Sequence, residues 1–583
     1  MNHPSRSFTA ILGASIAVFA VAMFGSCAGG DDPVPSIGEI EQIFQKTRAL
    51  ADQIDVTRSR GATTTTTGVA LAELIGSHNS VRIQLQRALS VGPASPMSEE
   101  DLRALNAMRR ALETYLPEQS NEPTSEAGDA DGSGKADCRY DPETLANGEG
   151  GYAALSKRIY SCFSEAAHSL SFEGERIDRL TVFGRLLSTD ELSRREGLWR
   201  AMAPLWGSVN GDNGPRSPYR TLIRMNAARL KSEGEALGES VRGIGVEPAV
   251  MEAWLIEVLQ KWHDITPNTA IEPWDFAYHA GRGDRALSDA IPVGSLRAIN
   301  DRFYRDLGAD PVALQVQYDL EPRPNKDPVA FATFGRRPRF ERGSWVLGEP
   351  WVFASYQIGG LGNLVELLHE TGHAIHIAAT RTRPAFMDWP DSDIFTEGVA
   401  DIATLEIYEP SCQQRYLGVS VPIDDAIVAK YAAIAMDIAW ALFEVRIHRT
   451  PERDPNEVWG EISQRYFRIK PHPNLAWWAV RGQLIDSPGY MMNYAAGAIM
   501  NADLRVRVHE LYGPCTEGGP GWYGQISESL YRFGLEKTSK EVIEAFLGRP
   551  VSPNALLDDM SRALAGAERA TRTAAFSAVG SRE

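Results

Sequence analysis

The sequence HETGH occupies residues 369–373 in the second half of a chain of 583 residues. Two histidines four positions apart lie on one face of an α-helix, so both imidazoles can reach the same metal ion. The carboxylate of Glu370 then lies beside that metal, where it can take a proton from a bound water molecule. Apolar residues recur at helical spacing over 361–375, which predicts a buried helix. The alternative is a chance match in a helix with two core histidines.

A catalytic zinc site needs three protein ligands and one open position for water. Besides His369 and His373, the strongest candidate is Glu397, which follows His373 by 24 residues. The segment 393–401 has helical spacing, and Asp401 lies four positions after Glu397 on the same face. Asp401 can accept a hydrogen bond from the second ring nitrogen of a ligand histidine, which fixes its tautomer. The alternatives are an ordinary solvated acidic face, or ligation by another acid of the preceding proline-containing loop: Asp388, Asp391 or Asp393.

Two tyrosines, Tyr490 and Tyr494, lie four positions apart in the sequence GYMMNY, residues 489–494. A phenol is a neutral donor that can bond a developing oxyanion beside zinc. The alternative is a packing pair on one helix face. Arg481 precedes them and is a weaker candidate, for a substrate carboxylate.

Four other residues near these motifs are expected to be mainly structural. His376, His472, Trp477 and Trp478 are predicted to serve packing or the surface rather than the chemistry.

The motif region resembles a known family. LLHETGHAIH, residues 367–376, is similar to the motif helix of the thimet oligopeptidase/neurolysin family, and FTE at 395–397 stands where that family has Phe-Val-Glu. EGVAD at 397–401 is closer to the Glu-Ala-Ile-Gly-Asp of the related angiotensin-converting-enzyme family, and 489–494 resembles the oligopeptidase Gly-Tyr-x-x-x-Tyr. The chain departs from the pattern at Ile485, where the oligopeptidases carry a histidine.

The resemblance implies a gluzincin metallopeptidase of the zinc oligopeptidase superfamily, in a bacterial exported form. It implies a mainly α, two-lobed fold with a deep central cleft and a short β-sheet beside the motif helix. It also implies one Zn²⁺ per chain, held by His369, His373 and Glu397, with Glu370 as general base. In the family the two tyrosines, here Tyr490 and Tyr494, help bind substrate and stabilise the tetrahedral intermediate.

The expected function is therefore zinc-dependent hydrolysis of peptide bonds in oligopeptides. Two other classes stay open: a zinc hydrolase acting on a non-peptide substrate, and a surface lipoprotein that binds peptide without catalysis. The net charge of −17 argues against nucleic acid as a partner, because nucleic-acid binding needs basic patches. The sequence leaves the oligomeric state open.

The first residues have the pattern of a secretory signal. Arg6 precedes an uncharged apolar run over 8–24, and Gly-Ser-Cys ending at Cys27 resembles a bacterial lipoprotein processing site. We expect an exported protein of the periplasm or outer membrane, attached to a membrane only through a lipid on Cys27. A plain signal peptide and an uncleaved anchor are the alternatives.

The remaining cysteines suggest disulfides, with Cys138–Cys162 and Cys412–Cys515 as the favoured pairs. Composition and periodicity divide the chain into six parts, which are in order: signal 1–27, tether 28–36, N-terminal helical region 37–116, flexible linker or surface loop 117–137, catalytic domain 138–565 and disordered tail 566–583.

Within the catalytic domain, one glycine-rich turn and several regular elements are predicted. Residues 359–362 are expected to form the turn before the motif helix, and a strand over 344–356 is a candidate to pair with substrate backbone. A second strand is expected over 312–318. Helices are expected over 180–187, 190–206, 218–237, 249–264, 424–449 and 455–467.

Overall fold

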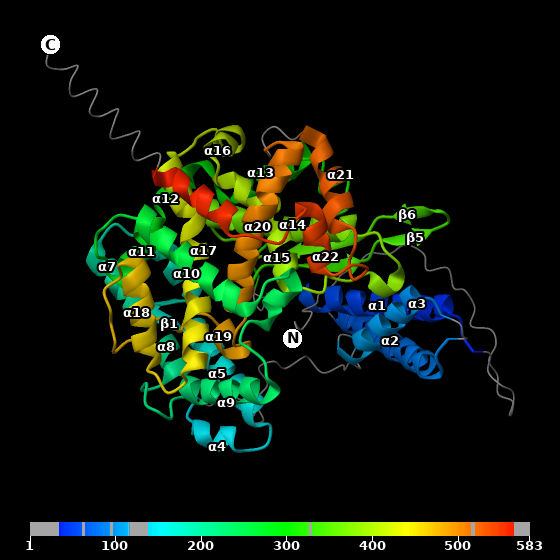
Figure 1. The fold of residues 1–583 in the computed structure, drawn as a ribbon, viewed down its shortest axis with the longest axis horizontal. Helices are drawn as coiled ribbons and strands as arrows, with labels where there is room; N and C mark the ends of the chain where they lie inside the picture. The colour runs from blue at the N-terminus through cyan, green and yellow to red at the C-terminus, as the bar shows by residue number, and fades with distance from the viewer. Residues whose placement is uncertain are drawn as a thin grey trace, which may run out of the picture.

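The computed structural model describes residues 34–60, 65–93, 97–114, 116, 138–323, 326, 329–514 and 519–564. The predicted signal 1–27, linker 117–137 and tail 566–583 lie outside these residues, as does most of the predicted tether 28–36. The described chain is mainly α, with short strands, as predicted. Figure 1 shows a large helical body with a smaller group of three helices packed along one edge.

The three N-terminal helices are α1 (Ile37–Ser59), α2 (Thr65–Val91) and α3 (Glu99–Thr114). α1 begins at a capping box, in which the Ser36 hydroxyl accepts from the Glu39 backbone N–H and the Glu39 carboxylate accepts from the Ser36 N–H. Their apolar faces form a small core of their own, which also includes Ala385 and Phe386 from the body. The group is thus packed both on itself and on the body.

The helical body contains one continuous core that runs from α5 to the last described helical residues. Its helices before the motif are α4 (Pro142–Ala146), α5 (Gly151–Ala167), α6 (Arg179–Ser188), α7 (Leu192–Arg200), α8 (Ala203–Asn210), α9 (Pro218–Glu233), α10 (Pro248–Ile265), α11 (Phe276–Ala280), α12 (Arg282–Leu287) and α13 (Leu296–Asp306). From the motif onward they are α14 (Leu361–Ala379), α15 (Asp393–Thr404), α16 (Pro410–Leu417), α17 (Ile423–Arg449), α18 (Pro455–Phe467), α19 (Gln483–Asp486), α20 (Met491–Tyr512), α21 (Trp522–Ile526) and α22 (Ser539–Leu547).

The helices predicted from periodicity are present, and one of them is divided. The stretch predicted as one helix over 190–206 forms α7 and α8, with a break at Ala201 and Met202. Pro204 has no backbone N–H to donate to the carbonyl four residues earlier, so α7 cannot continue through it. By length and composition α17 could cross a membrane, but 78% of its apolar window is buried inside the body, as in a core helix.

The strands differ more from the prediction. Residues 344–356 form two strands in different sheets, β6 (Ser344–Val346) and β7 (Glu349–Phe353), so the single predicted strand is wrong. The two strands separate at Gly348, where a Cβ would meet the Arg336 carbonyl oxygen at 2.8 Å. Of the strand predicted over 312–318, only the last two residues are in a strand, β3 (Gln317–Asp319), because residues 311–315 form a turn. β1 (Leu170–Phe172) and β2 (Glu175–Ile177) form a separate hairpin.

The sheet beside the motif helix has the order β3-β7-β4, with β3 parallel and β4 antiparallel to β7. β4 (Phe331–Arg336), which periodicity did not predict, is an edge strand of this sheet. Both β4 and β7 pack on α14. The hairpin of β5 (Arg339–Glu341) and β6 extends from the body on the same side as α1–α3 (Figure 1).

One of the two predicted disulfides is present. Cys138 and Cys162 form a disulfide that ties the residues before α4 to α5. Cys412 lies on α16 with its thiol free and its side chain in the core of the body, so the predicted pair with Cys515 is wrong. Cys515 itself lies outside the described residues.

Candidate metal centre and cleft

The HETGH motif lies on α14, which follows a glycine-rich turn as predicted. A Cβ on Gly359 would stand 1.8 Å from the Ile291 carbonyl oxygen, and Gly360 has φ of +101°. The turn therefore needs glycine for a close approach and for its backbone conformation. Along α14, the Tyr304 hydroxyl donates to the Leu368 carbonyl oxygen at 2.6 Å, immediately before the motif. These contacts fix where the motif helix begins and how it is rotated.

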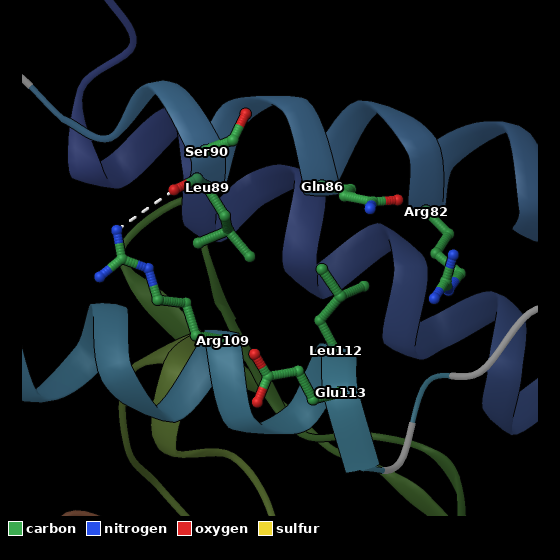
Figure 2. A pocket seen from close by; sticks show the side chains of 7 residues that line it. All are labelled: Arg82, Gln86, Leu89, Ser90, Arg109, Leu112 and Glu113. Carbon is green, nitrogen blue, oxygen red and sulfur yellow. Dashed lines mark hydrogen bonds between the residues drawn. The ribbon is translucent and has the colours of Figure 1, made fainter.

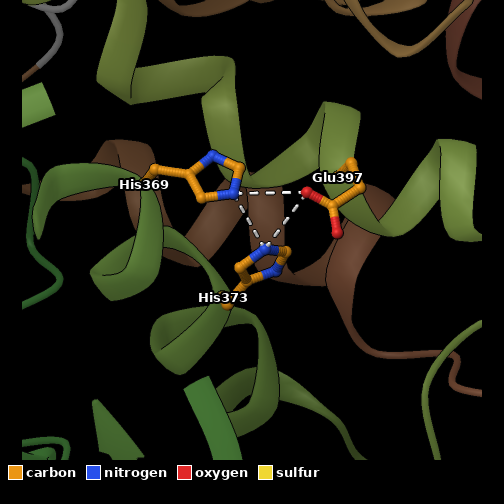
Figure 3. A group of neighbouring side chains, drawn as sticks. All are labelled: His369, His373 and Glu397. Carbon is orange, nitrogen blue, oxygen red and sulfur yellow. Dashed lines mark hydrogen bonds and ion pairs between the residues drawn. The ribbon is translucent and has the colours of Figure 1, made fainter. Parts of the chain in front are cut away.

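The three predicted ligands converge on one point (Figure 3). Nε2 of His369 lies 3.1 Å from Nε2 of His373 and 3.3 Å from Oε2 of Glu397, and the His373–Glu397 distance is 3.8 Å. Ligand atoms about 2.0–2.1 Å from a tetrahedral zinc lie roughly 3.3 Å from one another. The cluster therefore has the spacing of a tetrahedral metal site with three protein ligands, and its donor set suits a metal ion.

The close approach of α14 and α15 depends on a small residue inside the motif. A Cβ on Gly372 would lie 2.3 Å from the Ala400 carbonyl oxygen on α15. On the other side of α15, a Cβ on Gly398 would lie 2.2 Å from the Met500 side chain of α20. Glycine at both positions lets three helices pack close together, which carries Glu397 into reach of the two histidines. No sequence motif indicates this role for either glycine.

Asp401 occupies the position predicted for it. Its Oδ1 lies 2.8 Å from Nδ1 of His369. A neutral His369 that donates from Nδ1 leaves the lone pair of Nε2 directed at the cluster, as metal binding requires. Burial by itself lowers the pKa of His369, but the Asp401 carboxylate and Glu397 raise it above its ordinary value. The same histidines hold the pKa of Glu397 below its usual range, against the opposing effect of burial.

Glu370 is buried, with 7% of its surface exposed, and lines the same cleft as the three ligands. Burial raises the pKa of its carboxyl to about 7, while the charges of His369 and His373 oppose the shift. A carboxyl with a pKa near neutrality can both accept and release a proton. Glu370 thus lies close enough to the cluster for the charges of His369, His373 and Glu397 to act on its carboxyl.

Tyr490 and Tyr494 reach the cleft from the beginning of α20, one helical turn apart. Their ring centroids lie 5.4 Å from each other, and both line the cleft that contains Glu397. Burial raises the pKa of each phenol, and the negative charge of Glu397 raises it further. Both phenols are therefore protonated donors close to the metal cluster.

The other acidic residues that could have served as the third ligand bind elsewhere or lie outside the cluster. Asp388 pairs with Arg48 and Arg337, and Asp391 accepts from the Ser539 hydroxyl and backbone N–H at 2.7 Å. Asp393 lines the cleft but is not one of the three grouped ligands.

The remaining candidate residues pack in the core or pair with other side chains. His376 stacks on Tyr531, and burial lowers its pKa to about 3, so it is a neutral core residue. Nε2 of His472 lies 2.9 Å from Oε2 of Glu272, at hydrogen-bond distance. Arg481 lines the cleft but is paired with Asp437. Trp478 is fully buried, whereas Trp477 is buried and also borders the cleft. Ile485, where the sequence departs from the oligopeptidase pattern, is fully buried.

The cleft has a volume of about 1910 Å³ and is partly enclosed by the N-terminal helices. Arg48 and Asp52 of α1 and Arg103 of α3 stand in its wall. Arg48 pairs with Asp388, and the next residue, Trp389, has its ring centroid 5.6 Å from that of His373. The N-terminal helices therefore reach the loop that packs on His373, one of the candidate ligands, a contact that no motif in their sequence indicates.

A second hollow of about 410 Å³ lies between α2 and α3 (Figure 2). Its two arginines donate to backbone carbonyls, Arg82 to Leu116 at 2.6 Å and Arg109 to Leu89 at 3.2 Å. No candidate ligand or catalytic residue lies in its wall, so the chemistry of the described chain is concentrated in the large cleft.

Comparison with known proteins yields structural neighbours. No family model matches the chain, and no curated protein matches it. It is similar to a solved structure of metallocarboxypeptidase 1 of Trypanosoma cruzi, with a TM-score of 0.44 and 14% identity over 90% of this chain and 99% of that one. It is also similar to a structure described as "The Structure of CHT", with a TM-score of 0.47 and 13% identity over the same shares. Neither similarity identifies the family of this chain.

Proposed function

We propose that this protein is a zinc-dependent metallopeptidase that hydrolyses peptide bonds of oligopeptides. The observation that carries the proposal is the convergence of His369, His373 and Glu397 at ligand spacing, beside Glu370, in one large cleft. Two histidines and one carboxylate leave a fourth position open, as catalytic zinc sites do. The two phenols of α20 supply donors on the same cleft, which suits a reaction that develops an oxyanion.

The mechanism assigns a task to each side chain. Zinc bound at this cluster would lower the pKa of a water ligand toward neutrality and polarise the scissile carbonyl. Glu370 accepts the proton from the attacking water and later delivers it to the leaving amine. Tyr490 donates a hydrogen bond to the developing oxyanion, with Tyr494 as a second donor. Asp401 holds the ring of His369 in the ligand orientation.

The sheet beside the motif helix has an edge strand along which a peptide substrate could bind. The segment 344–356 was expected to offer one, but β7 lies between β3 and β4 and has both of its edges paired. The two edge strands of this sheet are β3 and β4, and of these β4 borders the cleft, which residues 330–334 line. We therefore infer that extended substrate adds to β4 rather than to β7, by main-chain hydrogen bonds. A peptide-bound structure with the substrate away from β4 would overturn this placement.

Two other functions are compatible with the same cluster. A zinc hydrolase of a non-peptide substrate would use the same ligands and base. A peptide-binding lipoprotein without catalysis needs none of the converging groups, so the complete ligand and base set favours an enzyme.

Zinc content and a quenched-peptide library assay separate these functions. The peptidase predicts one zinc per chain, cleavage of library peptides, loss of cleavage with a chelator and recovery with added zinc. A non-peptide hydrolase would bind zinc and cleave a panel of esters and amides but no peptide. A non-catalytic binder would retain library peptides uncleaved. Either of the last two results would overturn the proposal.

Export remains a proposal that rests on the first residues alone. The signal-like run and the Gly-Ser-Cys sequence support transfer to the periplasm or outer membrane, with Cys27 as the lipid-bearing residue. Mass spectrometry of the mature N-terminus tests it. A diacylglyceryl group on Cys27 is the expected result, and an unmodified N-terminus at another residue would contradict it.

A further inference from the structure

Glu444 carries a buried carboxyl group that none of the catalytic steps uses. It lies on α17, with 1% of its surface exposed, and has no ion-pair partner among the residues that the structure describes. Burying an ionisable group without a partner of opposite charge is costly, so such a residue needs compensating hydrogen bonds. The oxygens of Glu444 accept such hydrogen bonds from the amino end of α20, the helix that carries the two tyrosines of the site.

The two oxygens of Glu444 hold the backbone on both sides of Tyr490. Oε1 accepts from the Gly489 N–H at 2.6 Å, and Oε2 accepts from the Met491 N–H at 3.2 Å. The N–H of Tyr490 itself donates to the Ser487 carbonyl oxygen at 2.9 Å. Three consecutive backbone N–H groups at the start of α20 are therefore fixed, and the middle one belongs to Tyr490. Gly489 makes the turn possible with φ of +100°.

The backbone of Glu444 is itself held by a hydrogen bond from His448, which also contacts α9. The ring of His448, one turn later on α17, lies 2.8 Å through Nδ1 from the backbone carbonyl oxygen of Glu444 and 3.1 Å through Nε2 from Nδ2 of Asn226. Burial lowers the pKa of His448 to about 4, so its ring is neutral, donates to the carbonyl and accepts from the amide. The end of α17 that carries Glu444 is thus bonded to α9.

We propose that Glu444 is a positioning residue that sets the place of the Tyr490 phenol in the cleft through the backbone of residues 489–491. A carboxyl group suits this task because each of its two oxygens can accept one N–H. Burial raises the pKa of this carboxyl to about 8, and the two hydrogen bonds from Gly489 and Met491 oppose the shift. The inference rests on the proposed peptidase function and on Tyr490 as its oxyanion donor. Glu444 touches neither the cluster nor the substrate and acts only through α20.

The substitution Glu444→Gln tests this role. An amide offers one oxygen, and its NH₂ then faces a backbone N–H, so one of the two bonds is lost and replaced by a donor facing a donor. We expect kcat to fall about 10- to 100-fold, a fraction of the loss from removing an oxyanion donor. KM should change less than about threefold, since substrate binding elsewhere in the cleft is intact. Zinc content and fold should be retained.

A double-mutant cycle shows whether the loss passes through Tyr490. If it does, Glu444→Gln combined with Tyr490→Phe should be no more than about threefold slower than Tyr490→Phe alone, because the positioned hydroxyl is already absent. Asp503→Asn is the matched control: Asp503 is a buried carboxylate on α20 that binds Arg549 and the Ser552 N–H, away from the tyrosines. Its effect should multiply with that of Tyr490→Phe.

The outcomes separate the inference from the function on which it rests. A wild-type protein without peptidase activity refutes the proposed function. An active wild type whose Glu444→Gln variant keeps full kcat, or whose two effects multiply, refutes the positioning role alone. Glu444→Met is the second variant, because it removes both acceptor oxygens while keeping the length of the side chain, and it should show the same coupling. Loss of folding in both variants would also overturn the proposal, by making Glu444 a requirement of the fold.

Discussion

α14 and α20 meet at the same cleft but hold their reactive side chains in place by different means. On α14 and α15, the cluster is supported within the site: Asp401 orients His369, and Glu397 lies against both histidines. On α20, the backbone that carries Tyr490 is held by Glu444, a residue of another helix outside the cluster. The metal half of the site, on α14 and α15, is thus stabilised by contacts among its own residues. The tyrosine half, on α20, depends on packing against another helix. Substitutions in the two halves should therefore fail in different ways.

The largest effect is expected in the metal half, from Glu397→Ala. Removing one of three ligands leaves two histidines, which hold zinc weakly, so both metal and activity should be lost. Metal analysis after dialysis measures the first and peptide cleavage the second. Asp391→Ala, in the loop before α15, is the control and should keep its zinc, because Asp391 binds Ser539 rather than the cluster. A zinc-loaded Glu397→Ala protein would show that another residue is the third ligand.

In the tyrosine half, Tyr490→Phe should leave the zinc content unchanged and lower kcat. Removal of one oxyanion donor lowers kcat by about 10²–10³. Zinc content should stay at one per chain, which distinguishes this failure from that of the metal half. Steady-state kinetics on one cleaved peptide gives the result. A Tyr490→Phe enzyme with the wild-type kcat would remove this phenol from the mechanism.

Asp401→Asn should weaken the metal half without abolishing it. The asparagine oxygen can still accept a hydrogen bond from His369 but lacks the negative charge that strengthens the ligand. Loss of such a supporting contact lowers metal affinity about 10- to 100-fold. Competition with a chelator of known affinity measures the change. If the affinity is unaltered, the Asp401–His369 contact does not serve metal binding.

The smallest effect is expected from Tyr494→Phe. Its hydroxyl accepts from Nε2 of Gln483 at 3.4 Å, and its ring stands where the charges of Arg481 and Asp437 also act on it. This phenol should contribute more to substrate binding than to the oxyanion, so KM should rise up to about tenfold with kcat nearly unchanged. A loss of kcat as large as that of Tyr490→Phe would show that the two phenols act together.

The same contrast explains what the sequence could predict. HETGH, Glu397 and Asp401 can be recognised in the sequence because their residue types recur at short helical spacings on two helices. The structure brings all of them together. The long amphipathic helices were also predictable, apart from the break that Pro204 imposes after α7.

Features that depend on distant segments were not predictable. The need for glycine at 372 and 398 follows from how closely α14, α15 and α20 pack, and the importance of Glu444 follows from its reach to α20. The strand predicted over 344–356 divides because β7 pairs with β3 and β4, whereas β6 pairs only with β5. The contribution of α1 and α3 to the cleft wall likewise depends on contacts made across hundreds of residues, such as that between Arg48 and Asp388.

The most direct test of the central claim compares wild type with Glu370→Gln, each loaded with zinc. An amide in place of the carboxylate keeps the shape of the side chain but cannot accept the proton of the attacking water. The account predicts one zinc per chain in both proteins, cleavage of a quenched peptide by the wild type, and loss of nearly all cleavage in the variant. Full peptidase activity in zinc-loaded Glu370→Gln would contradict it.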